Sequence, residues 1–153
     1  MKLPVSIRRA TASDAQNVAE FNVAMALESE GRSLDLNVIF SGVRAVIEDD
    51  RHGFYLLAEF NDEVVGQLLV TYEWSDWRNG QFWWIQSVYV KPEMRGRGVY
   101  RSLHGFIEEA ARKSGACGLR LYVEKENFSA QKTYAKLGMT ETSYRMYEIE
   151  FKS

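Results

Sequence analysis

A short segment rich in arginine and glycine, residues 95–98, follows an apolar run that ends at Pro92. A helical pattern starts directly after this segment, at Val99. The first turn of a helix has backbone N–H groups without an intrahelical partner, and the helix dipole adds partial positive charge there. Arginine binds phosphate in a bidentate manner, and glycine lets the backbone approach an anion closely. The segment is therefore predicted to bind a pyrophosphate.

The residues after the last glycine distinguish between the known kinds of phosphate loop. A P-loop needs lysine followed by serine or threonine at this point, whereas this chain has Val99 and Tyr100. A dinucleotide fingerprint needs a third glycine where Arg101 stands. Neither pattern fits, and a solvated basic turn in front of an amphipathic helix is the plain structural alternative.

A second motif lies downstream, where an alternating apolar pattern predicts a strand over residues 118–124. Asn127 can then cap a helix that Gly138 ends. This strand completes a strand–helix–strand unit, whose first strand is expected at residues 82–90 and whose helix is expected at residues 99–113. Such a unit pairs its two strands in parallel.

Together the two motifs resemble those of the GNAT-type N-acetyltransferases. The segment from Arg95 to Val99 resembles their acetyl-CoA loop, whose pattern runs Arg/Gln-x-x-Gly-x-Gly/Ala, with Tyr100 at the last position. The second motif resembles their signature Asn-x-x-Ala-x-x-x-Tyr-x-x-x-Gly-Phe. Its matching residues are Asn127, Ala130, Tyr134 and Gly138, with Met139 for the aromatic residue. The resemblance spans roughly residues 5–151.

This resemblance implies an enzyme that transfers an acetyl group from acetyl-CoA to a primary amine by direct attack on the thioester. It implies that the Val88 backbone N–H polarises the carbonyl, that Tyr134 protonates the departing sulfur, and that Asn127 hydrogen-bonds the pantetheine arm. It also implies that the strand ending at Val90 splays from residues 121–123, with the arm between them. Acetyl-CoA is the expected cosubstrate and no metal is expected. The predicted cofactor-binding residues are Val88, Tyr89, Val90, Arg95, Gly96, Arg97, Gly98, Val99, Tyr100 and Asn127.

The proton acceptor and the acceptor pocket are less closely defined by the sequence. An alkylammonium group must lose its proton before it attacks. The central strand offers Gln86, which cannot accept a proton at neutral pH, so Glu73 and Glu28 join Tyr134 as predicted catalytic residues, with a water chain as the alternative. Trp74 and Trp77 lie near an expected turn, and three alternatives are open for them: they line an acceptor pocket, they form a dimer contact, or they pack within the domain. The predicted substrate-binding residues are Trp74, Trp77 and Gln86.

Composition limits the remaining choices. The 153 residues are expected to form a single GNAT-like domain, residues 1–153, and the net charge of −2 argues against a nucleic-acid partner. Apolar runs are too short to span a membrane, and the single cysteine fits a cytoplasmic location. The expected acceptor is a small-molecule or protein amine, and a homodimer is left open. The alternative functions are a non-catalytic acyl-CoA-binding sensor or scaffold and a nucleic-acid-binding domain.

Periodicity and turn residues predict an α/β fold, a central mixed sheet with helices on both faces as in the GNAT fold. Strands that are joined by short loops are expected to form an antiparallel meander. The expected strands cover residues 5–9, 54–60, 64–74, 82–90, 118–124 and 144–151, and the expected helices cover residues 13–27, 35–49, 99–113 and 127–138.

Overall fold

The computed structural model of this chain describes residues 3–152. It divides into two compact units, of which the first ends at Tyr122 and the second begins at Val123. The first unit holds β1 (Ser6–Arg9), η1 (Ala12–Asp14), α1 (Ala15–Glu30), α2 (Leu36–Glu48), β2 (Phe54–Phe60), β3 (Glu63–Ser75), β4 (Gly80–Val90), η2 (Pro92–Met94), α3 (Val99–Ser114) and β5 (Gly118–Arg120). The second unit holds α4 (Phe128–Lys136).

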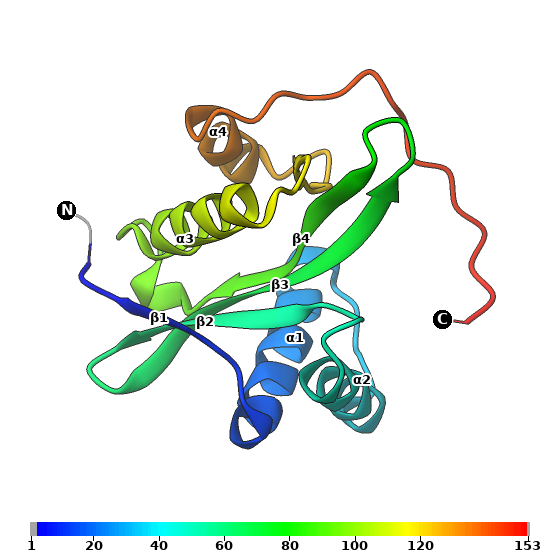
Figure 1. Cartoon of the computed structure of the whole chain (residues 1–153). Helices are drawn as coiled ribbons and strands as arrows, with labels where there is room; N and C mark the ends of the chain where they lie inside the picture. Colours follow the sequence, from blue (N-terminus) through cyan, green and yellow to red (C-terminus); the bar gives the residue numbers. More distant parts are fainter. Residues whose placement is uncertain (1–2, 153) are drawn as a thin grey trace. The chain divides into compact units, whose positions relative to one another are not determined.

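The sheet of the first unit has five strands in the order β1-β2-β3-β4-β5. Strands β1 to β4 pair antiparallel as a meander, and β5 returns through α3 to pair in parallel with β4. Helices α1 and α2 lie on one face of the sheet and α3 lies on the other (Figure 1). The predicted mixed sheet with helices on both faces is confirmed.

Two apolar layers form because the strands alternate their side chains between the two faces. Leu56 and Leu57 are adjacent in β2 and both are fully buried, but Leu56 packs with Leu103 of α3 whereas Leu57 packs with Val18 of α1. A strand that is covered on both faces carries consecutive apolar residues rather than an alternating pattern. This explains the unbroken apolar run of β2.

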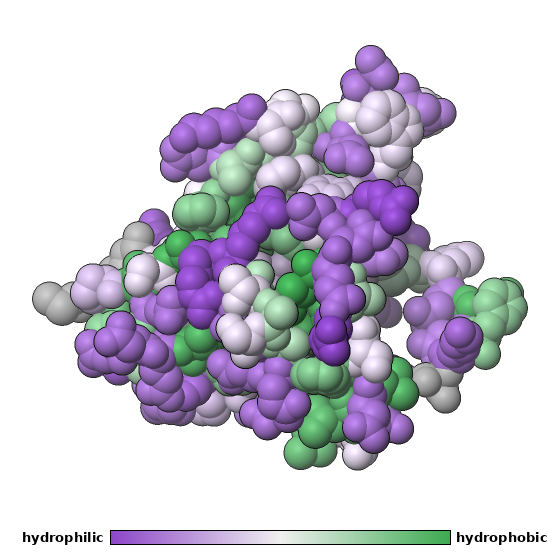
Figure 2. All heavy atoms as spheres, turned by 60° about the horizontal axis from the view of Figure 1, so that its bottom comes forward, coloured by the Kyte–Doolittle hydropathy of each residue, from purple (hydrophilic) through white to green (hydrophobic). Residues whose placement is uncertain are grey.

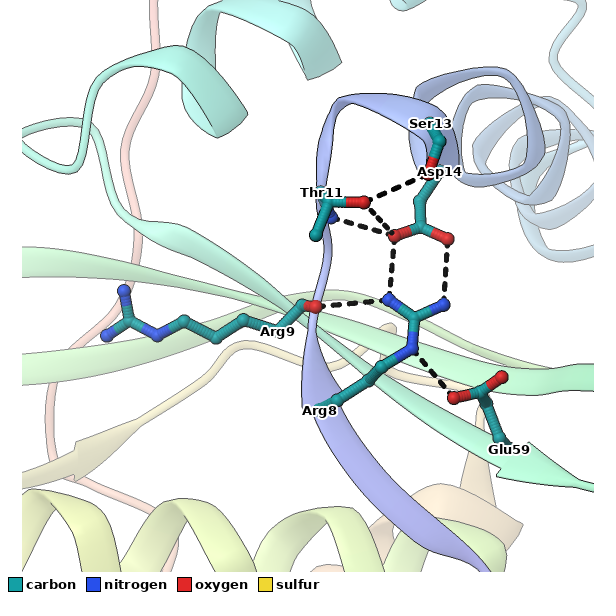
Figure 3. Close-up of polar contacts among 6 residues, drawn as sticks. All are labelled: Arg8, Arg9, Thr11, Ser13, Asp14 and Glu59. Carbon is teal, nitrogen blue, oxygen red and sulfur yellow. Dashed lines mark hydrogen bonds and ion pairs between the residues drawn. The ribbon is translucent and has the colours of Figure 1, made fainter. Parts of the chain in front are cut away.

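An ion-pair network ties β1 to the start of α1 and to β2 (Figure 3). The Arg8 guanidinium donates to both Asp14 carboxylate oxygens, at 2.7 and 2.9 Å, and to Glu59 at 2.7 Å. Asp14 also accepts from the Thr11 backbone N–H in a capping box. The hydrogen bond from Arg8 is the main reason that the pKa of Asp14 lies below its usual value.

We expect Asp14→Asn to lower the free energy of unfolding at neutral pH by about 1–3 kcal/mol, because it removes a part-buried charge-assisted pair. A carboxyl group whose pKa is lowered on folding stabilises the protein above its unfolded pKa and loses that effect as the pH falls through its folded pKa. The difference between parent and variant should therefore shrink below about pH 4. Urea titrations of both proteins at pH 7 and pH 3 measure this difference in the free energy of unfolding.

Asp50→Asn is the matched control, because Asp50 forms a 3.8 Å pair with Arg9 and its side chain is 82% exposed. Exposed pairs contribute about 0–1 kcal/mol. Equal losses of stability in the two variants would contradict the role given to Asp14.

Two predicted strands differ from the observed ones. The pattern at residues 118–124 forms a strand only over Gly118–Arg120. The strand predicted over residues 144–151 is wrong for this structure, since that segment has no strand structure and is drawn without an arrow (Figure 1). Alternation shows that a segment suits a sheet, but a strand forms only where a partner supplies hydrogen bonds.

Candidate active site

A β-bulge interrupts β4 opposite β3. Gln67 pairs with Tyr89 and Leu69 pairs with Gln86, so two residues of β4, Ser87 and Val88, lie opposite Leu68 alone. Ser87 has φ +50°, a left-handed conformation that non-glycine residues seldom adopt. A bulge changes the direction of the backbone groups around it. It lies at the position where the sequence predicts a functional backbone N–H, that of Val88.

Buried amide side chains hold this bulge from the interior. Gln67 Nε2 donates to the Ser87 carbonyl oxygen at 3.1 Å and to Asn22 Oδ1 at 2.8 Å. Asn22 in turn donates to the Tyr55 hydroxyl at 3.3 Å. These three side chains are 0%, 7% and 4% exposed respectively, so the network links α1, β2 and β3 to the bulge without help from bulk water.

Sequence reasoning missed this network. Its only signal was Gln67, a polar residue inside the apolar run of β3. Burying an amide costs free energy unless it is hydrogen-bonded, so such a residue indicates a buried partner. The identity of that partner depends on the tertiary structure.

We expect Gln67→Met, which keeps the length of the side chain, to lower the free energy of unfolding by about 2–4 kcal/mol. The substitution leaves the Ser87 carbonyl and Asn22 Oδ1 buried without their donor, at about 1–3 kcal/mol each. Gln81→Met is the control, because Gln81 lies exposed on the same sheet. Thermal unfolding of both variants measures the difference, and equal stability would show that the network does not hold the bulge.

Beyond the bulge lies a strand edge without a partner. β4 pairs with β5 only over Phe82–Trp84, opposite Gly118–Arg120. Within residues 3–152, the edge of β4 from residue 85 to 90 has no neighbouring strand on the β5 side. The pairing of β4 with β5 therefore ends at Trp84 and Arg120, and the splay of β4 from residues 121–123 stays a prediction. An unpaired edge offers N–H and C=O groups to an extended ligand.

The arginine–glycine segment connects this edge to α3 through η2. Gly96 and Gly98 have φ values of +73° and +83°, and Gly98 is the N-cap of α3. A Cβ at Gly96 would meet no atom within 4 Å, so its surroundings are open. The loop is anchored by the Arg97 carbonyl, which accepts from the Leu3 N–H at 2.8 Å, and by buried Val99. The predicted strand, glycine loop and helix N-terminus are all present.

Arg95 is held by α1 rather than left free at the loop. Its guanidinium donates to Glu28 Oε2 at 2.7 Å and to the Val90 carbonyl at 2.8 Å, and it lies 5.4 Å from the centre of the Tyr89 ring. The Tyr89 hydroxyl donates to the same Glu28 carboxylate at 3.3 Å. Glu28, which the sequence offers as a base, therefore lies at the phosphate-loop end of β4.

Tyr100 does not crowd the loop. Its ring packs against the buried layer beneath α3, and its hydroxyl lies 3.2 Å from His104 Nδ1, one turn further along the helix. The bulky side chain at the second position after Gly98 is thus directed toward the core.

Glu73 lies in a different cluster, at a corner of the sheet. Its Oε1 accepts from Trp84 Nε1 at 2.9 Å and from Arg120 Nη1 at 2.8 Å. Those hydrogen bonds, first from Trp84 and then from Arg120, lower the pKa of Glu73. Alternation along β4 places Gln86 on the same sheet face as Trp84, and Gln86 donates to Thr71 Oγ1 at 2.6 Å.

The predicted acceptor residues are not all brought together. Trp74 pairs with Gln81 at one end of β4, and Trp77 in the adjacent turn is 85% exposed. Glu28 contacts Tyr89 at the other end of the same strand, roughly 25 Å away at about 3.3 Å per residue. Glu73, Trp84 and Gln86 therefore share one face of the sheet, whereas Trp74, the next residue after Glu73 in β3, lies on the opposite face. Glu28 belongs to the phosphate-loop region.

The second unit carries the other predicted residues. Asn127 is the N-cap of α4, and its Oδ1 accepts from the Ala130 N–H at 3.1 Å, so its predicted capping role is confirmed. Tyr134 lies within α4 and is half-buried, and desolvation raises the pKa of its phenol. A phenol with a raised pKa is protonated at neutral pH, as a proton donor must be.

Among residues 3–152 there is no group of three or more His, Cys, Asp or Glu side chains that could hold a metal ion. In the same part of the chain, no helix combines the length and apolarity that crossing a membrane requires.

Two known proteins have sequences similar to this chain. A thialysine N-epsilon-acetyltransferase from Bos taurus is 36% identical over 75 residues, which cover 49% of this chain and 44% of that protein. An aminoalkylphosphonate N-acetyltransferase from Salmonella typhimurium is 28% identical over 144 residues, or 94% of this chain and 90% of that protein.

Solved structures extend the similarity to the fold. The crystal structure of a possible acetyltransferase from Clostridium difficile 630 superimposes on this chain with a TM-score of 0.90 and a sequence identity of 46%. The match covers 97% of this chain and 99% of the Clostridium difficile chain. The crystal structure of a predicted acetyltransferase with acetyl-CoA from Clostridium acetobutylicum has a TM-score of 0.79 at 14% sequence identity. The match covers 95% of this chain and 96% of the Clostridium acetobutylicum chain. The sequence model of the acetyltransferase (GNAT) family matches residues 22–139. This chain is a member of the GNAT acetyltransferase family.

Proposed function

We propose that this protein transfers an acetyl group from acetyl-CoA to a primary amine. The observation that carries the proposal is the continuous path along β4: a backbone bulge at Ser87 and Val88, an unpaired strand edge, a glycine loop and a helix N-terminus. A thioester, a pantetheine arm and a pyrophosphate need these features in that order. The solved relative named with acetyl-CoA shares this fold.

In this proposal the pyrophosphate binds the N–H groups of the first turn of α3, which Gly98 leaves accessible. Arg97 and Arg101 are exposed beside that turn. Arg95 supplies a third guanidinium once phosphate oxygens replace the Glu28 carboxylate. The pantetheine amides pair with the free edge of β4, and Asn127 is assigned to the arm by its family resemblance.

For the chemical step, the neutral amine attacks the thioester carbonyl carbon while the Val88 N–H stabilises the developing negative charge on oxygen. The bond from carbon to sulfur then breaks, and Tyr134 gives its proton to the departing thiolate. The proton that the amine loses restores Tyr134 through solvent. The assignment of Tyr134 rests on the family signature.

We place the acceptor at the corner of the sheet formed by Glu73, Trp84 and Gln86, beside the bulge. Carboxylate and indole groups attract an ammonium ion. Trp77, which is 85% exposed in the turn between β3 and β4, is assigned to contacts with larger acceptors, whereas Trp74 lies on the opposite face of the sheet. Because the pKa of Glu73 is lowered, we assign it to binding the ammonium, and either Glu28 or a water chain to accepting the proton.

We expect Glu73→Gln to raise KM for the amine about 2–5-fold with little change in kcat, because an exposed ion pair contributes about 0.2–1 kcal/mol. The acidic limb of the pH profile of kcat/KM should persist. Glu28→Gln is assayed alongside it. If Glu73→Gln loses the acidic limb of the pH profile, Glu73 is the base. If Glu28→Gln loses this limb instead, Glu28 is the base.

The decisive experiment measures free thiol released from acetyl-CoA with a panel of amines, which includes an aminoalkylphosphonate, thialysine, a polyamine and a peptide amino terminus. Release that depends on the amine establishes the transferase. Tight binding of acetyl-CoA without release of thiol for any amine would favour the sensor or scaffold alternative.

We also propose that both units act as one domain and, from the single cysteine, that the protein works in the cytoplasm.

A further inference from the structure

The ion pair between Glu73 of β3 and Arg120 of β5 is only partly saturated. Arg120 Nη1 and Trp84 Nε1 both donate to the same carboxylate oxygen, Glu73 Oε1, at 2.8 and 2.9 Å. An arginine can bind a carboxylate through two parallel hydrogen bonds, but this pair has one. Within residues 3–152, Glu73 Oε2 accepts no hydrogen bond and Arg120 donates none through Nε or Nη2. The pair can therefore accept from one further group and donate to another.

Aromatic rings hold the two charges in place. The Arg120 guanidinium lies 3.7 Å from the centre of the Phe82 ring, and the Trp84 indole, which donates to Glu73, lies 6.1 Å from the Tyr122 ring. All of these residues belong to the first unit. A guanidinium that is already stacked and paired loses little further freedom when it binds a ligand. The negative and the positive group are thus preorganised side by side.

The ion pair lies at a distance from the bulge where the amine reacts in the proposed function. Leu119 and Leu121 pack against the layer beneath α3, so Arg120 between them projects from the other face of the sheet. Arg120 pairs in register with Trp84, and from Trp84 to Val88 the strand covers about 13 Å at about 3.3 Å per residue. The hairpin of β3 and β4 extends beyond α1 and α2 (Figure 1). The ion pair therefore binds a different part of the acceptor from the amine that reacts.

This distance limits the length of the acceptor. Contacts of about 3 Å at each end, one with Arg120 and one between the amine and the thioester carbon, leave about 7 Å for the acceptor itself. Bonds of about 1.5 Å give a chain of about five bonds for that length. About five bonds thus separate the reacting amine from the group that the ion pair binds.

On the basis of the acetyl transfer proposed above, we propose that the acceptor is an α-amino acid with a primary amine at the end of its side chain. Its carboxylate binds Arg120, its α-ammonium group binds Glu73, and its side-chain amine attacks the thioester. A zwitterion suits a fixed ion pair because each of its charges lies next to the opposite charge. Hydrophilic and hydrophobic side chains adjoin on the side of the molecule where α1 and α2 lie (Figure 2), as an alkyl chain between charged groups requires.

The test measures thiol release from acetyl-CoA with lysine, with lysinamide, whose carboxyl group is uncharged, and with cadaverine, which has no carboxyl group. Arg120→Gln removes the charge that is assigned to the carboxylate. Arg112→Gln is the matched control, because Arg112 also pairs with a glutamate, Glu108, at 3.1 Å, but on α3 at the other face of the sheet. Thermal unfolding shows whether both variants are folded.

We expect Arg120→Gln to raise KM for lysine about tenfold with little change in kcat, because it removes one charge-assisted contact. KM for cadaverine should not rise in this variant. The parent should have a lower KM for lysine than for lysinamide, by a similar factor. Arg112→Gln should keep all the values of the parent.

The Trp84 indole N–H, which donates to Glu73, gives a readout that does not depend on catalysis. Its NMR signal, identified by its absence in Trp84→Phe, should shift when lysine is added to the CoA complex, and Arg120→Gln should need about tenfold more lysine. If this shift occurs but no amine releases thiol, the amino-acid site stands and the proposed acetyl transfer fails. If thiol is released but lysine and lysinamide have equal KM values, or Arg120→Gln matches the parent, the amino-acid site is wrong while the transfer stands.

Discussion

Replacing Tyr134 by phenylalanine is expected to lower kcat by about 10²–10⁴-fold, because the variant keeps the aromatic ring and removes only the proton donor. Affinity for acetyl-CoA should change little. Burial raises the pKa of this phenol, so the parent carries the proton throughout the neutral range. Single-turnover measurements of thiol release, which isolate the chemical step, are the appropriate readout.

Tyr144→Phe is the control for this variant, because Tyr144 is 74% exposed and also loses only a hydroxyl group. The rate of thiol release by Tyr144→Phe should match that of the parent. If Tyr134→Phe turned over like the parent while chemistry limited the rate, another group or solvent would have to protonate the sulfur.

The second large effect is expected at Gly98, the N-cap of α3. Gly98→Asp places a carboxylate where the proposed pyrophosphate meets the N–H groups of the helix. A charge-assisted contact with phosphate is worth about 1.5–3 kcal/mol, so the loss of one weakens binding of acetyl-CoA by about 10–100-fold. Calorimetric titration with CoA measures the change.

Gly98 has φ +83°, so any side chain there adds backbone strain. Gly98→Asn adds a side chain of the same size without the charge, and asparagine tolerates this conformation about as well as aspartate does. The difference between the two variants therefore isolates the electrostatic effect. Equal affinities for CoA in two folded variants would mean that the phosphates bind elsewhere.

Local chemistry made much of the fold predictable. Strand β2, Phe54–Phe60, has the bounds that its apolar run predicts, and it is followed by Asn61 and Asp62, both at positive φ. Asn127 caps α4 through its own side chain, as expected. In each case the deciding interaction lies within a few residues, so the sequence contains it.

Contacts between distant residues were not predictable in the same way. Arg95 and Glu28 are 67 residues apart, and nothing near either one indicates that the guanidinium would meet that carboxylate. The sequence offers Glu73 as a base, but Arg120, 47 residues away, pairs with it and helps to lower its pKa. An ionisable group acquires its properties from neighbours that only the packed chain supplies.

The sequence by itself determined the order of strands and helices, the glycine loop before α3 and the family to which both motifs point, because periodicity, capping and glycine conformation are local. Only the tertiary structure decided that Gln67 holds the bulge at Ser87, that Glu28 and Glu73 lie in different regions, and that residues 144–151 do not form a strand. Burial, ion pairing and strand addition each require a second segment, and its position follows from how the whole chain packs.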